Sequence, residues 1–189
     1  FVPYLERDIA AVDEPIADPA CIPLYKLAQE IKRHVTVVLS GEGADEIFCG
    51  YTWQRDYMAA LAAGDPAADD LVAYYARSMA MGSFDRARLA GLLHPDLHAH
   101  LPDDPWWFYR SLVRPELPSL QRMQWLDIRA FMGEQVLTKV DRASMAVSLE
   151  ARAPFLDHKL IEWAATLPAG LKLHGTEGKW VLKQALEQR

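Results

Sequence analysis

A short β-branched run followed at once by a glycine loop limits most strongly what this chain can fold into. Residues 35–39 read Val-Thr-Val-Val-Leu, and the segment 40–45 supplies two glycines and two carboxylates before a helical pattern begins near Ile47. Strand, glycine turn and helix in this order place a ligand site at the carboxyl end of a parallel strand. The apolar run itself predicts a strand that is buried on both faces.

The glycine loop has the composition of a ligand site. Gly41 and Gly43 allow a sharp turn and a close approach of the backbone to a ligand. Glu42 and Asp45 place negative charge where a metal ion or an amine can bind. The loop matches neither the Walker A sequence nor the dinucleotide-binding glycine pattern. From the residues alone, the alternative is that the two acids are ordinary favourable charges at a helix N-terminus.

Helical periodicity dominates the rest of the chain, so the fold class is mainly α with one strand at residues 35–39. The spacing of apolar residues predicts a helix from Ile22 to Arg33 and further helices after Ile47. Residues 1–22 are rich in Pro and Asp and are expected to be loop with little helix. Residues 121–150 fit one kinked helix or two. Expected helix caps are Asp69, Ser119, Asp157 and Thr176.

Two cations are candidates for binding an anionic ligand. Lys179 follows Thr176 by three residues and is expected in the first turn of a helix, where a lysine opposes the helix dipole. A cation at a helix N-terminus favours a bound phosphate, and the alternative is a solvated surface lysine. Arg152 lies just before Pro154 and could hold a carboxylate or phosphate bidentately. Its alternative role is in a buried ion-pair network.

Composition excludes several classes of partner. The net charge of -6 and the pI near 5.5 argue against a nucleic-acid surface, which requires a basic patch. The sequence contains no run of about 18 apolar residues, so no membrane-spanning helix is expected. Cys21 and Cys49 match no metal or redox spacing, and a cytoplasmic location is the simplest interpretation.

Three blocks of sequence resemble the synthetase domain of the asparagine synthase family. The first is Ser-Gly-Glu-Gly-Ala-Asp-Glu-Ile-Phe-Cys-Gly-Tyr at residues 40–51. The second is Leu-Thr-Lys-Val-Asp-Arg-Ala-Ser-Met-Ala at 137–146, continued by Ser-Leu-Glu-Ala-Arg-Ala-Pro-Phe-Leu-Asp at 148–157. A weaker third block comprises Leu167-Pro168, residues 171–173 and Gly178-Lys179. Their order and spacing fit the family over nearly the whole chain.

The resemblance implies an α/β ATP-pyrophosphatase fold, similar to the adenine nucleotide alpha hydrolases. Residues 1–189 would be its mainly α portion, truncated at both ends, with one buried strand near 35–39. The family's pyrophosphate loop, Ser-Gly-Gly-x-Asp-Ser, and its glutaminase domain do not occur in this sequence. We therefore expect these missing portions of the parent to be partners of the chain, which by itself is expected to lack activity and to tend to form homo-oligomers.

The resemblance also implies an ATP-dependent ligase that converts aspartate to asparagine through β-aspartyl-AMP, with ammonia supplied from glutamine. In that family ATP and Mg²⁺ are the cofactors. The implied roles are ATP binding by Ser40, Gly41, Gly43 and Asp45, Mg²⁺ binding by Asp45, catalysis by Glu42 and Lys179, and substrate binding by Glu42 and Arg152.

Two alternatives to asparagine synthesis stay open. One is a β-lactam synthetase or another amidating or cyclising enzyme of the same fold. The lactam-forming relatives depart from Glu at the position of Glu42, so this residue favours asparagine synthase-like chemistry. The other is a non-catalytic helical interaction module that keeps the ancestral motifs.

Overall fold

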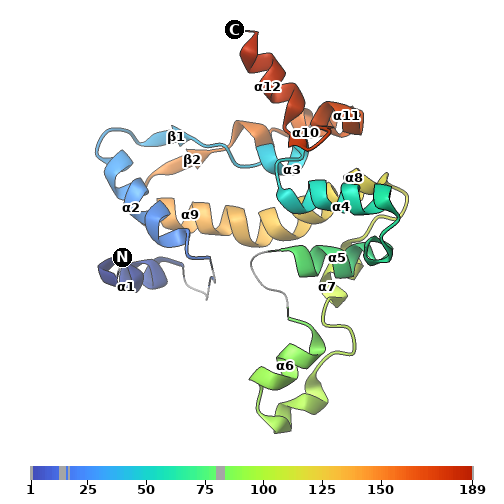
Figure 1. The fold of residues 1–189 in the computed structure, drawn as a ribbon. Coiled ribbons are helices and arrows are strands. Elements are labelled where there is room, and N and C mark those ends of the chain that lie inside the picture. The colour runs from blue at the N-terminus through green and yellow to red at the C-terminus, as the bar shows by residue number, and fades with distance from the viewer. Residues whose placement is uncertain (1, 13–15, 17, 80–83, 189) are drawn as a thin grey trace. The chain divides into compact units, whose positions relative to one another are not determined.

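The fold is largely helical, and its described part forms two compact units (Figure 1). The computed structural model describes residues 2–12, 16, 18–79 and 84–188. The first unit comprises residues 1–50 and 127–189, and the second comprises residues 51–126. The mainly α class predicted from periodicity is confirmed. None of the helices in the described ranges is long and apolar enough to cross a membrane.

The first unit begins with two helices and a strand that lead into the glycine loop. α2 packs against α1 and α9, and Val12, Cys21, Tyr25 and Ala143 form a buried core cluster among them. The elements of this unit are α1 (Val2–Val12), α2 (Cys21–Lys32), β1 (Val37–Leu39), α3 (Ala44–Phe48), the π-helix η3 (Asp127–Leu137), α9 (Thr138–Met145), β2 (Glu150–Arg152), η4 (Pro154–Leu156), α10 (His158–Thr166), α11 (Ala169–Lys172), β3 (Leu173–His174), β4 (Glu177–Gly178) and α12 (Trp180–Glu187).

A second core cluster of this unit lies directly behind the glycine loop. Ile47 and Phe48 of α3 pack with Ala164 of α10, and all three are buried. The Phe48 ring meets the Phe155 ring edge to face, with centroids 6.3 Å apart. Asp157 accepts hydrogen bonds from the amides of Lys159 and Leu160, so its predicted role as the cap of α10 is confirmed. Apolar packing of α3, the helix that follows the glycine loop, therefore fixes the end of the loop.

The second unit is helical throughout its described part. Its core contains Tyr57, Tyr75, Met123 and Leu126, contributed by three different helices. The elements are α4 (Thr52–Ala63), η1 (Pro66–Ala68), α5 (Leu71–Ser78), α6 (Arg86–Leu92), η2 (Pro95–His100), α7 (Trp107–Leu112) and α8 (Ser119–Leu126).

Helix boundaries correct three of the predictions. The stretch 1–22 was expected to be loop, but α1 occupies Val2–Val12; Pro3 is tolerated there because it lies in the first helical turn. Asp70, not Asp69, caps α5, because its carboxylate accepts from the amides of Val72 and Ala73. Thr176 caps no helix; it lies in the turn between β3 and β4. Residues 121–145 belong to α8, η3 and α9, which follow one another without an intervening loop, and the helical stretch ends there, because a turn follows and β2 begins at Glu150.

The strand content also differs from the expectation of a single buried strand. Four short strands lie in the described part, forming a parallel pair β1–β2 and an antiparallel pair β3–β4. The three additional strands are two or three residues long, too short for an alternating pattern to be recognised in the sequence.

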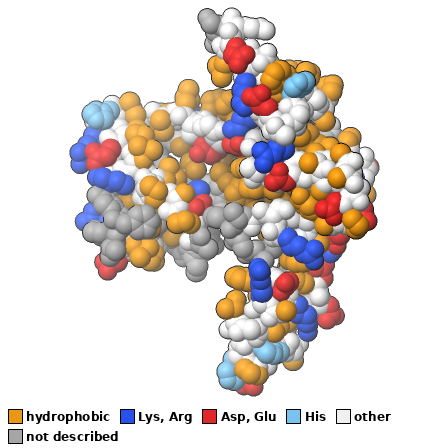
Figure 2. All heavy atoms as spheres, in the orientation of Figure 1, with side chains coloured by type: hydrophobic (Ala, Val, Ile, Leu, Met, Phe, Trp, Pro, Cys, Tyr) orange, Lys and Arg blue, Asp and Glu red, His pale blue; other side chains and the backbone are white. Residues whose placement is uncertain are grey.

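β1 is not buried on both faces, so that part of the prediction is wrong. Val37 is 38% and Leu39 71% exposed, because β2 is the strand paired with β1 in the described chain. Figure 2 shows hydrophobic side chains on the surface of the first unit over β1 and β2. An apolar sequence therefore forms the strand, although its neighbours here do not cover it.

Candidate functional site

The glycine loop is held at the end of β1 by backbone contacts. The Ser40 amide donates to the Arg152 carbonyl oxygen at 2.8 Å and so continues the pairing of β1 with β2. Gly43 has a φ of 95°, and a Cβ there would overlap the side chain of Leu156. Gly41, in contrast, is exposed and has open space around it. Glycine is therefore required by local geometry at position 43 rather than at position 41.

Asp45 and Lys179, which lie far apart in the sequence, meet in the structure. Asp45 is in the first turn of α3, and its Oδ1 lies 2.7 Å from Lys179 Nζ. Both side chains are about one third exposed. Among the described site residues inferred from the sequence, these two form an ion pair, whereas Ser40 and Arg152 meet through a hydrogen bond to the Arg152 backbone.

The backbone positions Lys179 through the β3–β4 hairpin. The Lys179 amide donates to the Phe48 carbonyl oxygen at 2.9 Å, at the end of α3. A Cβ at Gly178 would overlap the carbonyl of Cys49, and one at Gly50 would overlap both side chains of the Asp45–Lys179 pair. Two glycines therefore allow the hairpin and α3 to approach closely enough for the ion pair to form.

The local setting of Lys179 differs from the predicted one. Lys179 was expected inside the first turn of a helix capped by Thr176. It is instead the residue that precedes α12, with a left-handed φ of 56°. Because Thr176 is used in a hairpin turn, the helix begins later than the capping pattern indicates.

Glu42 faces a different part of the first unit. It lines a pocket of about 320 Å³ whose other walls are mostly apolar. The remaining lining residues are Ala20, Pro23, Leu24, Leu27, Val136, Lys139 and Val140. The Glu42 Oε2 atom is inaccessible to solvent and has no hydrogen-bond partner among the described residues. A buried carboxylate oxygen in this state lacks a donor, which is energetically costly.

Among the described residues that line this pocket, Lys139 is the only cation, and it already forms an ion pair. Lys139 Nζ forms an ion pair with the Asp18 carboxylate, and both side chains are largely buried. Lys139 therefore neutralises Asp18, and the Glu42 carboxylate contributes the remaining negative charge of the pocket.

Arg152 lies on the surface, at the end of β2 next to the glycine loop. Its Nε donates to Glu150 Oε1 at 2.7 Å, and both side chains are more than half exposed. The alternative of a buried ion-pair network is therefore wrong for this arginine. Its backbone carbonyl, through Ser40, contributes to the position of the glycine loop.

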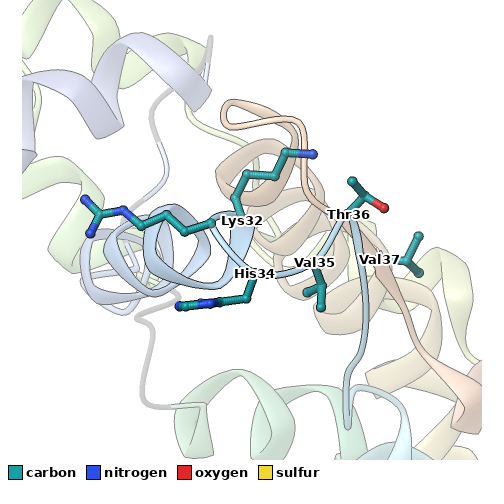
Figure 3. A pocket seen from close by; sticks show the side chains of 6 residues that line it. Lys32, His34, Val35, Thr36 and Val37 are labelled. Atoms are coloured by element: carbon teal, nitrogen blue, oxygen red, sulfur yellow. The ribbon is translucent and has the colours of Figure 1, made fainter.

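A separate pocket of about 530 Å³ lies at the turn between α2 and β1 (Figure 3). Lys32, Arg33 and His34 contribute to its lining, but the side chains of Lys32 and His34 point in different directions. Lys32 Nζ donates to the Ser148 carbonyl oxygen, and Arg33 pairs with Glu30. These cations do not converge on a common ligand position.

Lys172 is a buried residue near the site that was not singled out from the sequence. It ends α11 and is 2% exposed. Burial lowers the pKa of its amine from 10.5 to about 8, partly opposed by the nearby Cys49 thiol. The neighbouring leucines 171 and 173 give the only sequence signal, because a lysine between apolar residues is often drawn into a core.

The lowered pKa of Lys172 predicts a stability that rises with pH. Below pH 8 the amine is charged in both the folded and the unfolded chain, and burying that charge costs stability. Between pH 8 and 10.5 the folded chain loses the proton first, so the free energy of unfolding should increase by about 3 kcal/mol. Urea unfolding of wild type and Lys172→Met at pH 7.5 and 10 measures this.

In that experiment Lys172→Met should show a smaller increase than wild type, because it lacks the titrating amine. Lys159→Met is the matched control, since Lys159 is exposed on α10. Equal pH dependence of wild type and Lys172→Met would show that the buried amine does not govern this effect.

The glycine loop, the Asp45–Lys179 pair and residues 137–157 all lie within the range that one family model matches. The model described as asparagine synthase matches residues 1–189. The chain belongs to the asparagine synthase family. The predicted family resemblance is thereby confirmed.

Individual members of the asparagine synthase family match over nearly the whole chain. A Mycobacterium tuberculosis relative that carries the provisional name of a glutamine-hydrolysing asparagine synthetase is 35% identical over 99% of this chain and 32% of its own length. Glutamine-hydrolysing asparagine synthetase 1 of Bacillus subtilis is 32% identical, covering 99% of this chain and 33% of the relative. Asparagine synthetase 3 of the same organism is 30% identical, with 99% and 29% covered. The chain thus spans about a third of the length of these relatives.

Proposed function

We propose that this chain forms one side of the synthetase site in a glutamine-dependent asparagine synthetase with an α/β ATP-pyrophosphatase fold. Its family membership and the names of its relatives support this reaction. In the proposed chemistry, a side-chain carboxylate oxygen of aspartate attacks the α-phosphorus of ATP and pyrophosphate leaves. Ammonia then attacks the activated carbonyl carbon and displaces AMP.

The Asp45–Lys179 pair has the chemistry to bind a metal–nucleotide complex. Mg²⁺ prefers oxygen ligands and is commonly held by one or two carboxylates together with substrate phosphates. Asp45 offers such an oxygen, and no set of three or more His, Cys, Asp or Glu side chains able to hold a metal occurs in the described residues. These residues fit a Mg²⁺ ion that is shared with ATP. When bound, the ion would neutralise phosphate charge.

Lys179 and the glycine loop would act on the phosphates and the adenylate. The Lys179 ammonium can donate hydrogen bonds to phosphate oxygens while charge builds up on the departing pyrophosphate. Ser40, Gly41 and Gly43 provide the backbone turn along which ATP would lie, next to Asp45. Arg152 is the proposed contact for a substrate carboxylate.

The observation that carries the proposal is the buried Glu42 Oε2 atom, which has no hydrogen-bond partner in the described part of the chain. An incoming amine has the N–H donors that this oxygen lacks, and the carboxylate can accept the proton that the amine loses on attack. The largely apolar walls of the neighbouring pocket favour small, weakly hydrated groups over large polar ones. Glu42 is therefore assigned to the amide-forming half of the reaction.

Replacement of Glu42 in the intact parent enzyme tests this assignment. Glu42→Gln should lower ammonia-dependent asparagine formation by about 100-fold or more, the usual loss when a general base is removed. Aspartate-dependent exchange of pyrophosphate into ATP, which reports the adenylation step, should fall far less. Glu134→Gln is the matched control, because Glu134 is exposed on η3. Equal losses in both assays would assign Glu42 to adenylation instead.

A further inference from the structure

The ion pair between Asp45 and Lys179 places a cation on the carboxylate that is proposed to bind Mg²⁺. Lys179 Nζ lies 2.7 Å from Asp45 Oδ1, the distance of a direct charge-assisted hydrogen bond. A divalent cation approaching Asp45 must therefore displace the ammonium group or bind beside it.

The backbone on both sides of the Asp45–Lys179 contact holds the two residues close together. Lys179 has a left-handed φ of 56°, its amide is bonded to the end of α3, and Gly50 leaves room for both side chains. A freely rotating surface lysine would need none of these features. The pair is a property of how α3 and the β3–β4 hairpin are joined.

We propose that Lys179 is the internal counter-ion of Asp45. A divalent cation without nucleotide is then kept off Asp45 by the lysine. The metal ion enters together with a polyphosphate, which binds Lys179 in place of Asp45. This inference rests on the proposed function, which assigns Asp45 to Mg²⁺ and Lys179 to phosphate.

Charge balance explains why the two ligands should enter together. A metal ion bound alone would leave the Lys179 ammonium unpaired beside a second cation. With a polyphosphate present, Asp45 exchanges the lysine for the metal and Lys179 exchanges the carboxylate for a phosphate, so every charge keeps a partner. Because both side chains are about one third exposed, the pair itself contributes little stability and can open without disturbing the core.

The thermodynamic consequence is a coupling between lysine release and metal binding. Removing the positive charge at position 179 should strengthen the binding of a divalent cation in the absence of nucleotide. Couplings of this kind typically change an affinity by about 5-fold to 150-fold. The direction is opposite to that expected if Lys179 only supported the fold, because loss of structure would weaken metal binding.

Mn²⁺ binding to the chain of 189 residues provides the test, since carboxylate oxygen sites accept Mn²⁺ as well as Mg²⁺. Electron paramagnetic resonance measures free Mn²⁺ during titration without any nucleotide. Lys179→Met should bind at least about 5-fold more tightly than wild type. Lys183→Met is the matched control, because Lys183 pairs with Glu177 instead. Its Mn²⁺ affinity should equal that of wild type.

Two further variants make the result specific. Asp45→Asn added to Lys179→Met should remove the gained affinity, which places the ion on Asp45. If Lys179→Met does not fold by circular dichroism, Lys179→Gln makes the same change of charge with a polar side chain. An unchanged Mn²⁺ affinity in the folded variant, or a gain that survives Asp45→Asn, would overturn the proposal. Because the measurement uses no aspartate, ammonia or ATP, its failure is separate from a failure of the Glu42 test.

Discussion

In the intact parent enzyme, Asp45→Asn should lower aspartate-dependent formation of AMP by about 100-fold or more. The substitution keeps the size of the side chain and removes the charge that is proposed to hold Mg²⁺ and that pairs with Lys179. Glutamine hydrolysis, catalysed in the proposed glutaminase portion, should be retained. Both activities can be measured on one preparation, as AMP released and as glutamate formed without aspartate.

The retained glutaminase activity is the internal evidence that the Asp45→Asn enzyme is folded. Asp69→Asn serves as the matched control, because Asp69 is exposed in the second unit and makes the same change of charge. Wild-type AMP formation by the Asp45→Asn enzyme would refute the assignment of Asp45 to the metal–nucleotide complex.

Gly178→Ala should have the largest effect on stability among single substitutions near the site. The added methyl group would overlap the backbone carbonyl of Cys49, which cannot rotate away as a side chain can. Relief requires the β3–β4 hairpin to move from the end of α3, at a cost of about 3 kcal/mol or more. The midpoint of urea unfolding of the 189-residue chain measures this change.

Gly170→Ala is the control for Gly178→Ala. Gly170 lies in α11, and a Cβ there meets no atom within 4 Å, so alanine should be neutral or slightly stabilising. If both variants unfolded at the wild-type midpoint, the close approach of the hairpin to Cys49 would not be needed for the native structure.

The predictions for Asp45→Asn and Gly178→Ala concern the same part of the structure, the junction of α3 with the β3–β4 hairpin. Asp45 is positioned by the short helix α3, which packs through Ile47 and Phe48 against apolar residues. Lys179 is positioned by the β3–β4 hairpin, which is hydrogen-bonded to the end of that helix. Gly178→Ala should therefore also affect the Asp45–Lys179 pair, although neither charged residue is altered. This connection explains why glycines adjacent to the charged residues belong to the site as much as the charges do.

Local sequence is sufficient to predict an element whose structure depends mainly on its own residues. The apolar spacing of α2 and the capping carboxylate of Asp157 were recognised because periodicity and caps act within one or two helical turns. The glycine loop at residues 40–45 was recognised for a similar reason, since its glycines and acids are consecutive. The family resemblance rested on such contiguous motifs, which need no knowledge of tertiary contacts.

The remaining features depend on segments that meet only after folding. They are the pairing of β1 with β2, the contact of Asp45 with Lys179, the burial of the Glu42 Oε2 atom and the burial of Lys172. The charges of Asp45 and Lys179 can be identified in the sequence, but the distance between them in the folded chain cannot. That separation depends on Gly178, where the absence of a side chain lets two backbones come together, and on Gly50, where it leaves room for the two charged side chains.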